Sequence, residues 1–220
     1  MTPDLLLAID SATTRVVVAL GERDGAIIDA TDWPAGYRHG ETLLPAIDDL
    51  LARTGTARAR LAAIVVGTGP GAFTGLRVGI ATAKGLAHGL GLPIIGVSTA
   101  EALLAGTPRG SVLLLPAGPS DRLVVRPGMP ATLVPAGTEP DLDPDESIVA
   151  VDLVDRAPSD EAARGETARA GLAGALLAIG ADRLTGGSVD DLATLVPEYV
   201  TLPRGVRTES GEVAWSHDRP

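Results

Sequence analysis

A glycine-rich loop between two hydrophobic segments offers the clearest opportunity for chemistry. Residues 67–71 read Gly-Thr-Gly-Pro-Gly, after a predicted strand over residues 61–66 and before a predicted helix over residues 74–89. Backbone N–H groups at such a junction can face an anion, aided by the helix dipole. The loop is not a Walker A motif, because Leu76 and Arg77 stand where Lys and Ser/Thr are needed, and it lacks the G-x-G-x-x-G spacing. A phosphate site and a simple tight turn both remain open.

Other reactive side chains form no evident catalytic constellation. Ser11 and Thr13 supply hydroxyl groups, but no evident general base accompanies them. Cysteine is absent, and no H-E-x-x-H motif is present. The three histidines are far apart in the sequence: His39, His88 and His217. We therefore expect neither a catalytic residue nor a metal site.

Composition restricts the classes of partner. The chain of 220 residues has a formal net charge of -10 and only 2% aromatic residues, so its core must be aliphatic. No basic stripe is visible, which argues against a protein that binds RNA by itself, since such binding depends on neutralising phosphates. No apolar run approaches about 18 residues, so we expect no membrane span and a cytoplasmic location.

Hydrophobic periodicity predicts a mixed sheet in the first half of the chain. Three strands form an antiparallel meander, and helices then alternate with strands, which implies a sheet covered by helices with a right-handed crossover. The expected strands span residues 5–10, 15–20, 26–30, 61–66 and 94–97, and the expected helices span residues 41–53 and 74–89.

The second half repeats this order weakly, as three strands followed by a helix. Proline and glycine interrupt residues 106–144 throughout. The expected strands span residues 112–115, 123–126, 131–134, 148–151 and 197–201, with helices over residues 161–179 and 190–195 and a polar tail over residues 204–220.

Small residues form a stripe along the predicted helix after the glycine loop. Gly75, Gly79, Thr82 and Leu86 share one side of this helix. Small side chains at this spacing let another backbone approach closely. The stripe therefore predicts a close crossing, either within the chain or with a partner protein.

Four segments of the first half together resemble successive motifs of the TsaB (YeaZ) family. They read LAIDSAT at residues 7–13, RHGETLLP at 38–45, GPGAFTGLR at 69–77 and LPIIGVST at 92–99. The resemblance covers roughly residues 5–105, and residues 197–199, Pro-Glu-Tyr, are similar to a weaker C-terminal motif.

This resemblance implies an α/β fold of the actin-like ATPase (ASKHA, ribonuclease H-like) class, with two lobes of mixed sheets covered by helices. We expect a first lobe over residues 1–103, a reduced second lobe over residues 104–203 and a tail over residues 204–220. The family implies a non-catalytic subunit that supports TsaD, which transfers threonylcarbamoyl to adenosine 37 of tRNAs reading codons that begin with A. The expected partners are TsaD, the ATPase TsaE, tRNA indirectly through the complex, and a second copy of the chain when TsaD is absent.

The resemblance also indicates which residues to examine. Asp10 stands where actin-like ATPases keep an acid near the nucleotide-bound metal, but Ala12 replaces a favoured glycine. Asp10, Ser11 and Thr13 are therefore candidates for a degenerate nucleotide site, with no cofactor and no ATP binding expected for this chain alone. TsaD-like subunits bind a metal through histidines after the strand corresponding to residues 94–97, and this chain has none there.

Candidate partner contacts lie on the two first-lobe helices, which we expect to dock on TsaD: Arg38, His39, Leu43, Leu44, Ile47, Gly75, Arg77, Val78, Gly79, Thr82 and Leu86. The alternative is an enzyme, either a small actin-fold ATP-binding phosphotransferase or a peptidase-like hydrolase, that would use Asp10 and the glycine loop.

Overall fold

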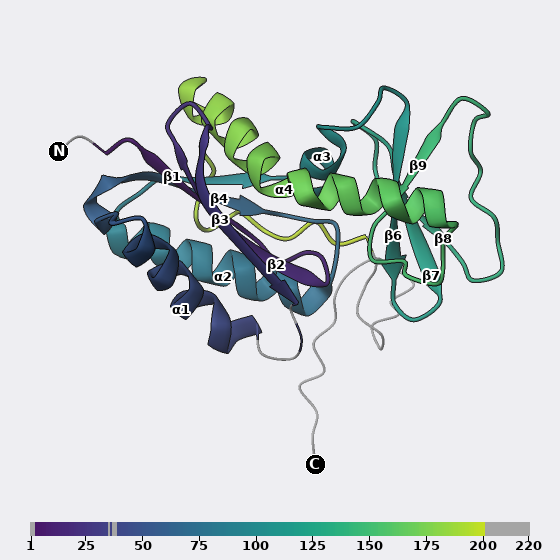
Figure 1. The fold of residues 1–220 in the computed structure, drawn as a ribbon, viewed down its shortest axis with the longest axis horizontal. Helices are drawn as coiled ribbons and strands as arrows, with labels where there is room; N and C mark the ends of the chain where they lie inside the picture. The colour runs from purple at the N-terminus through teal and green to yellow at the C-terminus, as the bar shows by residue number, and fades with distance from the viewer. Residues whose placement is uncertain (1–2, 35, 37–38, 201–220) are drawn as a thin grey trace, which may run out of the picture.

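The computed structural model describes residues 3–34, 36 and 39–200, which fold into two sheets and the helices that cover them (Figure 1). In this part of the chain no helix is both long enough and apolar enough to cross a membrane. Residue Arg38 and the predicted tail over residues 204–220 lie outside the described residues.

The first sheet has five strands in the order β3-β2-β1-β4-β5. Strand β1 is central: it pairs antiparallel with β2 and parallel with β4, and β4 pairs parallel with β5. All residues of β1 and β4 are buried, as expected for unbroken apolar runs in a sheet covered on both faces. The strands are β1 (Leu5–Asp10), β2 (Arg15–Glu22), β3 (Ile27–Pro34), β4 (Leu61–Gly67) and β5 (Ile94–Val97).

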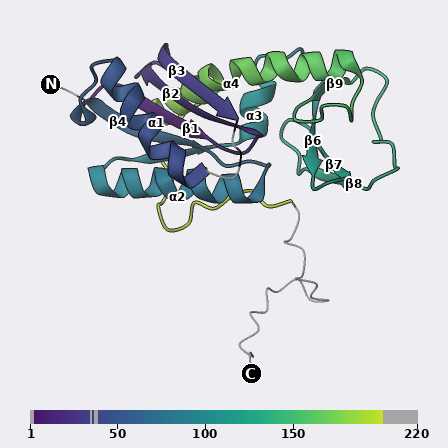
Figure 2. The ribbon, with the colours of Figure 1, turned by 60° about the horizontal axis from the view of Figure 1, so that its bottom comes forward.

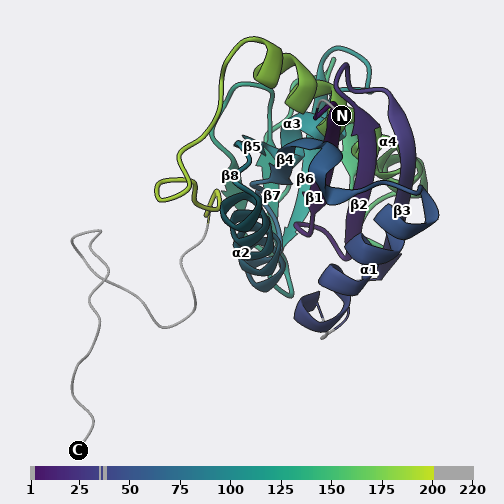
Figure 3. The same ribbon diagram turned by 90° about the vertical axis from the view of Figure 1, so that its left-hand side faces the viewer.

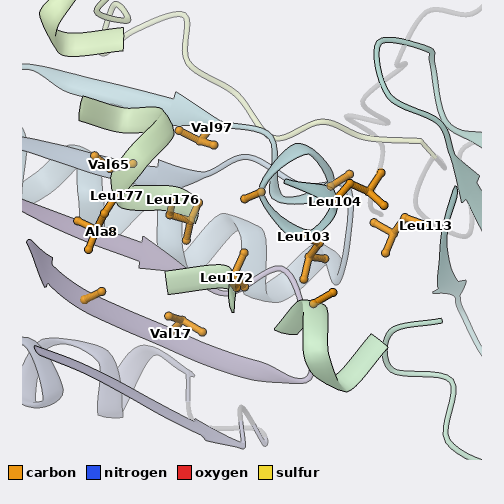
Figure 4. Packing of buried hydrophobic residues seen from close by; sticks show 14 of the residues in the cluster. Ala8, Val17, Val65, Val97, Leu103, Leu104, Leu113, Leu172, Leu176 and Leu177 are labelled. Carbon is orange, nitrogen blue, oxygen red and sulfur yellow. The ribbon is translucent and has the colours of Figure 1, made fainter. Parts of the chain in front are cut away.

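Helices cover both faces of this sheet (Figure 2). Helices α1 (His39–Arg53) and α2 (Phe73–Leu90) pack on the face that carries Leu7 and Ile9. Helix α4 (Ser159–Thr185) packs on the opposite face, which carries Leu6 and Ala8 (Figure 4). The alternation of side chains along β1 therefore distributes its residues between two separate hydrophobic layers.

The second sheet is smaller, with the order β8-β7-β6-β9. Its strands are β6 (Ser111–Ala117), β7 (Asp121–Val125), β8 (Thr132–Val134) and β9 (Ser147–Ala150). Three antiparallel strands are again followed by a parallel one, but residues 135–146 form a loop where the first lobe has helix α1. The expected α/β fold, with two mixed sheets and a reduced second lobe, is confirmed.

Helix α4 connects the two sheets. Near its beginning, Gly165 lies against the backbone of Ala150, and near its end Gly180 lies against the side chain of Val65; a methyl group at either glycine would overlap these atoms. The two glycines are separated by about 22 Å along the helix axis. One continuous helix therefore holds both lobes, and it extends past residue 179, where the sequence predicted its end.

The structure differs from the sequence prediction at four places. A short helix, α3 (Thr99–Leu104), was missed, and a single 3-10 turn, η1 (Arg58–Arg60), precedes β4. Residues 192–194 form a turn instead of a helix, because the carboxylate of Asp191 accepts hydrogen bonds from the N–H groups of Ala193 and Thr194. Residues 197–200 form no strand; in this segment the N–H of Glu198 donates to the carbonyl of Thr68, directly after β4, and Tyr199 contacts Phe73 at the beginning of α2, near which the segment ends in Figure 3.

Candidate functional site

Asp10, at the end of β1, points its carboxylate into the protein interior. The side chain is fully buried, and it accepts hydrogen bonds from the Thr99 hydroxyl (2.6 Å) and from the N–H of Ala12 (2.9 Å). A methyl group at Gly67 would overlap the carboxylate. Burial raises the pKa of Asp10 to about 6, although the two hydrogen bonds oppose the shift. The carboxylate therefore bonds to its own chain.

The other two candidates for a nucleotide site are also bonded within the chain. Ser11 donates its hydroxyl proton to the carbonyl of Gly75 (2.8 Å), and Thr13 donates to the carbonyl of Arg15 (2.9 Å). Both side chains are buried. Neither hydroxyl has an adjacent general base among these partners, so the arrangement does not provide an activated nucleophile.

Three N–H groups in and directly after the glycine loop have partners within the chain. Thr68 donates to the carbonyl of Val97 (2.8 Å), Gly69 to the hydroxyl of Thr99 (3.0 Å), and Ala72 to the carbonyl of Ala12 (2.7 Å). Donors that already have partners do not form an anion cradle. Of the two interpretations left open by the sequence, these contacts favour the tight turn.

A cleft of about 650 Å³ lies between the lobes, and we refer to it as the interlobe cleft. Its walls include Thr14, Phe73, Leu115 and Pro116. Of the residues that the structure describes, no lysine or arginine lines it, and three acidic residues do: Asp121, Asp152 and Glu198. Burial raises the pKa of Glu198. Among the described residues, no group of three or more acidic or histidine side chains is placed to hold a metal ion. These residues do not fit the nucleotide that the actin-like fold implies.

A groove between α1 and α2 has a different character. Its volume is about 380 Å³, and we refer to it as the α1–α2 groove. Leu44 is 50% exposed at this site, and Leu86 and Leu90 line the groove from α2. Gly85 and Gly89, also in its lining, have open space where a side chain would project. This surface is apolar and can receive side chains of another protein.

The partner-contact candidates divide by burial. The buried candidates are Leu43, Ile47, Gly75 and Gly79, and the half-buried ones are Val78, Thr82 and Leu86. The exposed candidates are Leu44 and Arg77, and His39 is the first residue of α1. The buried glycines contact the first lobe itself, because Gly79 lies directly against the Ser11 hydroxyl. The small-residue stripe therefore makes a close crossing within the chain at its N-terminal end.

Arg77 is engaged with the chain segment that follows α4. Its guanidinium lies 3.7 Å from the ring centre of Phe73, and its Nε donates to the hydroxyl of Tyr199 (2.9 Å). The rings of Phe73 and Tyr199 are 5.2 Å apart. Sequence reasoning treated Arg77 as a partner contact and missed this stacked arrangement, although residues 197–199 belong to the weak C-terminal motif.

Comparisons with known proteins agree with this architecture. The sequence model of the family described as "TsaD: tRNA N6-adenosine threonylcarbamoyltransferase" matches residues 34–125. The tRNA threonylcarbamoyladenosine biosynthesis protein TsaB of Escherichia coli is 43% identical over 101 residues, which cover 46% of this chain and 43% of that protein. The protein of the same name from Bacillus subtilis is 37% identical over 100 residues, which again cover 46% of this chain and 43% of that protein. The match thus spans less than half the length of these relatives.

A solved structure extends the similarity to both lobes. YeaZ from Pseudomonas aeruginosa superposes with a TM-score of 0.68 and 24% sequence identity, covering 90% of this chain and 100% of that one. At this identity the likeness shows the fold, and its coverage of the chain includes both lobes. The chain is thus similar in sequence to TsaB proteins over 46% of its length, and similar in fold to YeaZ over 90% of its length.

Proposed function

We propose that this chain serves in threonylcarbamoyladenosine biosynthesis on tRNA as a non-catalytic subunit that binds the TsaD-type catalytic subunit. The names of its relatives support the pathway. The first lobe, residues 1–103, carries the docking surface in this proposal. TsaE joins the complex, tRNA is held by the assembly, and a second copy occupies the same surface when TsaD is absent.

The observation that carries the proposal is the α1–α2 groove. Leu44 and Leu90 are exposed there, next to two glycines with open space above them. Burying an apolar groove against a complementary protein surface is favourable by about 25 cal/mol for each Å² removed from water. Asp48 and Arg58 form an ion pair at the rim (2.7 Å), which leaves the centre of the groove apolar, as in many protein interfaces.

The non-catalytic role is supported by the contacts of Asp10 and of the glycine loop. The alternative enzyme needs Asp10 near a nucleotide or a metal, but the Asp10 carboxylate contacts Thr99 and Ala12 and is not part of the cleft lining. The acidic interlobe cleft would also repel a polyphosphate. These contacts favour a docking protein over the enzyme.

A charge placed in the groove tests the proposal. Leu44→Glu introduces a carboxylate that docking would desolvate, so binding of the cognate TsaD should weaken by at least about 100-fold. The matched control is Leu133→Glu, because Leu133 is similarly exposed (43%) but lies on β8 of the second lobe. Size-exclusion chromatography with light scattering measures the complex. Equal binding by both variants would contradict the proposal.

Reconstituted tRNA modification tests the pathway itself. With an activated threonylcarbamoyl donor supplied, TsaD, TsaE and tRNA should form threonylcarbamoyladenosine efficiently only when this chain is added, and Leu44→Glu should fail to restore the reaction. Leu133→Glu should restore it. Full modification without the chain would refute the assigned role even if the two proteins bind each other.

A further inference from the structure

Asp152 links the second lobe to the first. It follows β9, and its carboxylate accepts hydrogen bonds from the N–H (2.6 Å) and the hydroxyl (2.5 Å) of Thr14, in the loop between β1 and β2. Arg169 of α4 donates to the same carboxylate (3.1 Å). The Asp152 side chain is only 4% exposed. A buried carboxylate with three donors is held in one position.

The backbone of Asp152 supports the same interpretation. Its φ is 59°, in the left-handed region that residues other than glycine rarely adopt. Such a conformation can mark a functional position. At Asp152 it coincides with side-chain contacts to Thr14 and Arg169.

The loop that Asp152 holds also contacts the beginning of α2. We refer to residues 11–14 as the hairpin loop. The Ser11 hydroxyl donates to the carbonyl of Gly75, and the carbonyl of Ala12 accepts from the N–H of Ala72. Gly79, one turn further along, lies against Ser11. The hairpin loop therefore lies between Asp152 and the first two turns of α2.

Helix α2 depends on these contacts, because it has no cap of its own. Its N-cap residue, Ala72, makes no side-chain hydrogen bond to the first turn. Without a capping side chain, the N-terminal turn of a helix is its least stable part. The hairpin loop supplies the missing constraint from outside the helix.

We propose that Asp152 is a positioning residue that acts through the hairpin loop to fix the first two turns of α2, so that the second lobe controls the shape of the docking helix. Its effect on partner binding rests on the proposed function; its effect on α2 does not. The contacts form one continuous path from Asp152 through Thr14, Ser11 and Ala12 to Gly75.

Hydrogen exchange of the full chain, measured without any partner, tests the proposal. Asp152→Gly removes the carboxylate but accommodates the positive φ, so it separates the lost contact from backbone strain. Amides of residues 72–79 should exchange at least about tenfold faster, while amides of α1 keep their rates. Unchanged exchange in residues 72–79, or an equal increase in α1 and α2, would overturn the proposal.

The chain contains a closely matched control. Asp155, three residues further along the connection between β9 and α4, has the same φ of 59° but is exposed, so Asp155→Gly repeats the backbone change without removing a buried carboxylate. It should leave the exchange of residues 72–79 at the wild-type rate. An effect as large as that of Asp152→Gly would assign the result to the turn and overturn the role of the carboxylate.

Affinity for TsaD separates the two proposals. Asp152→Gly should weaken binding by about fivefold to tenfold, less than Leu44→Glu, because it alters the docking helix without entering the groove. Loss of binding in Leu44→Glu, with wild-type exchange and affinity in Asp152→Gly, refutes only the positioning role. Faster exchange in Asp152→Gly, with full binding by Leu44→Glu, supports the positioning role and refutes only the docking surface.

Discussion

The Thr99 hydroxyl and the Asp10 carboxylate form a hydrogen bond of 2.6 Å between two fully buried residues that are 89 positions apart in the sequence. Thr99 also accepts a hydrogen bond from the N–H of Gly69 (3.0 Å). It therefore joins the end of β1 to the glycine loop. An acid that could bind a nucleotide-bound metal instead connects three segments of the first lobe.

The first prediction concerns pH. Burial raises the pKa of Asp10 to about 6 from its usual 3.8, so the folded chain binds this proton more tightly than the unfolded chain. Protonated Asp10 contributes fully to the free energy of unfolding below pH 3.8, and this contribution is lost as the pH rises through about 6. The free energy of unfolding should fall by on the order of 3 kcal/mol over this pH range. Asp10→Asn should remove this decrease, as measured by urea unfolding at several pH values.

Its control is Asp155→Asn, which removes an exposed carboxyl group from the second lobe. This variant should retain the decrease in unfolding free energy between about pH 4 and pH 6. If Asp10→Asn shows the same decrease as the wild type, Asp10 is not the titrating group.

The arrangement of the first lobe could be predicted because local patterns determine it. Strands β1 and β4 are unbroken apolar runs, and the helical spacing of Leu43, Ile47 and Leu50 identifies α1. Helix α3 was missed because six residues are too few to show a helical period. The length of α4 was underestimated because its glycines, usually signs of a helix end, are needed where it crosses the sheets.

The contacts of the candidate site could not be predicted in the same way. Ser11 and Gly75 are 64 positions apart, and Thr14 and Asp152 are 138 apart. Periodicity describes which face of an element is apolar, but it does not indicate which polar groups meet across the fold. The sequence therefore left open whether the glycine loop is a phosphate site or a tight turn.

The second prediction compares two glycines of α2. Gly79→Ala should destabilise the fold by about 2–4 kcal/mol, because its methyl group would overlap the Ser11 hydroxyl in a packed contact. Gly85→Ala, in the same helix with open space above it, should stabilise the fold by about 1 kcal/mol through helix propensity. Thermal and urea unfolding measure both. A stabilising Gly79→Ala would show that the hairpin loop does not pack closely on α2.

The third prediction concerns Tyr199. Tyr199→Ala removes the ring beside Phe73 and the acceptor for Arg77, so residues 196–200 should become more susceptible to limited proteolysis. The unfolding free energy should fall by about 1 kcal/mol or less, since the stacked cation is exposed. Tyr199→Phe keeps the ring, so its susceptibility to proteolysis should lie between those of Tyr199→Ala and the wild type. Identical proteolysis of Tyr199→Ala and wild type would contradict the stacking role.

The fourth prediction concerns nucleotides in the interlobe cleft. Asp121, Asp152 and Glu198 line this cleft, and no lysine or arginine among residues 3–34, 36 and 39–200 does, so calorimetry with ATP and magnesium should show no binding up to about 1 mM. Binding in the micromolar range that disappears in Asp10→Ala would contradict this prediction and favour the phosphotransferase. The measurement needs no partner protein. It therefore distinguishes an enzyme from a docking subunit even if the cognate TsaD cannot be prepared, because only the enzyme requires the cleft to hold a phosphate.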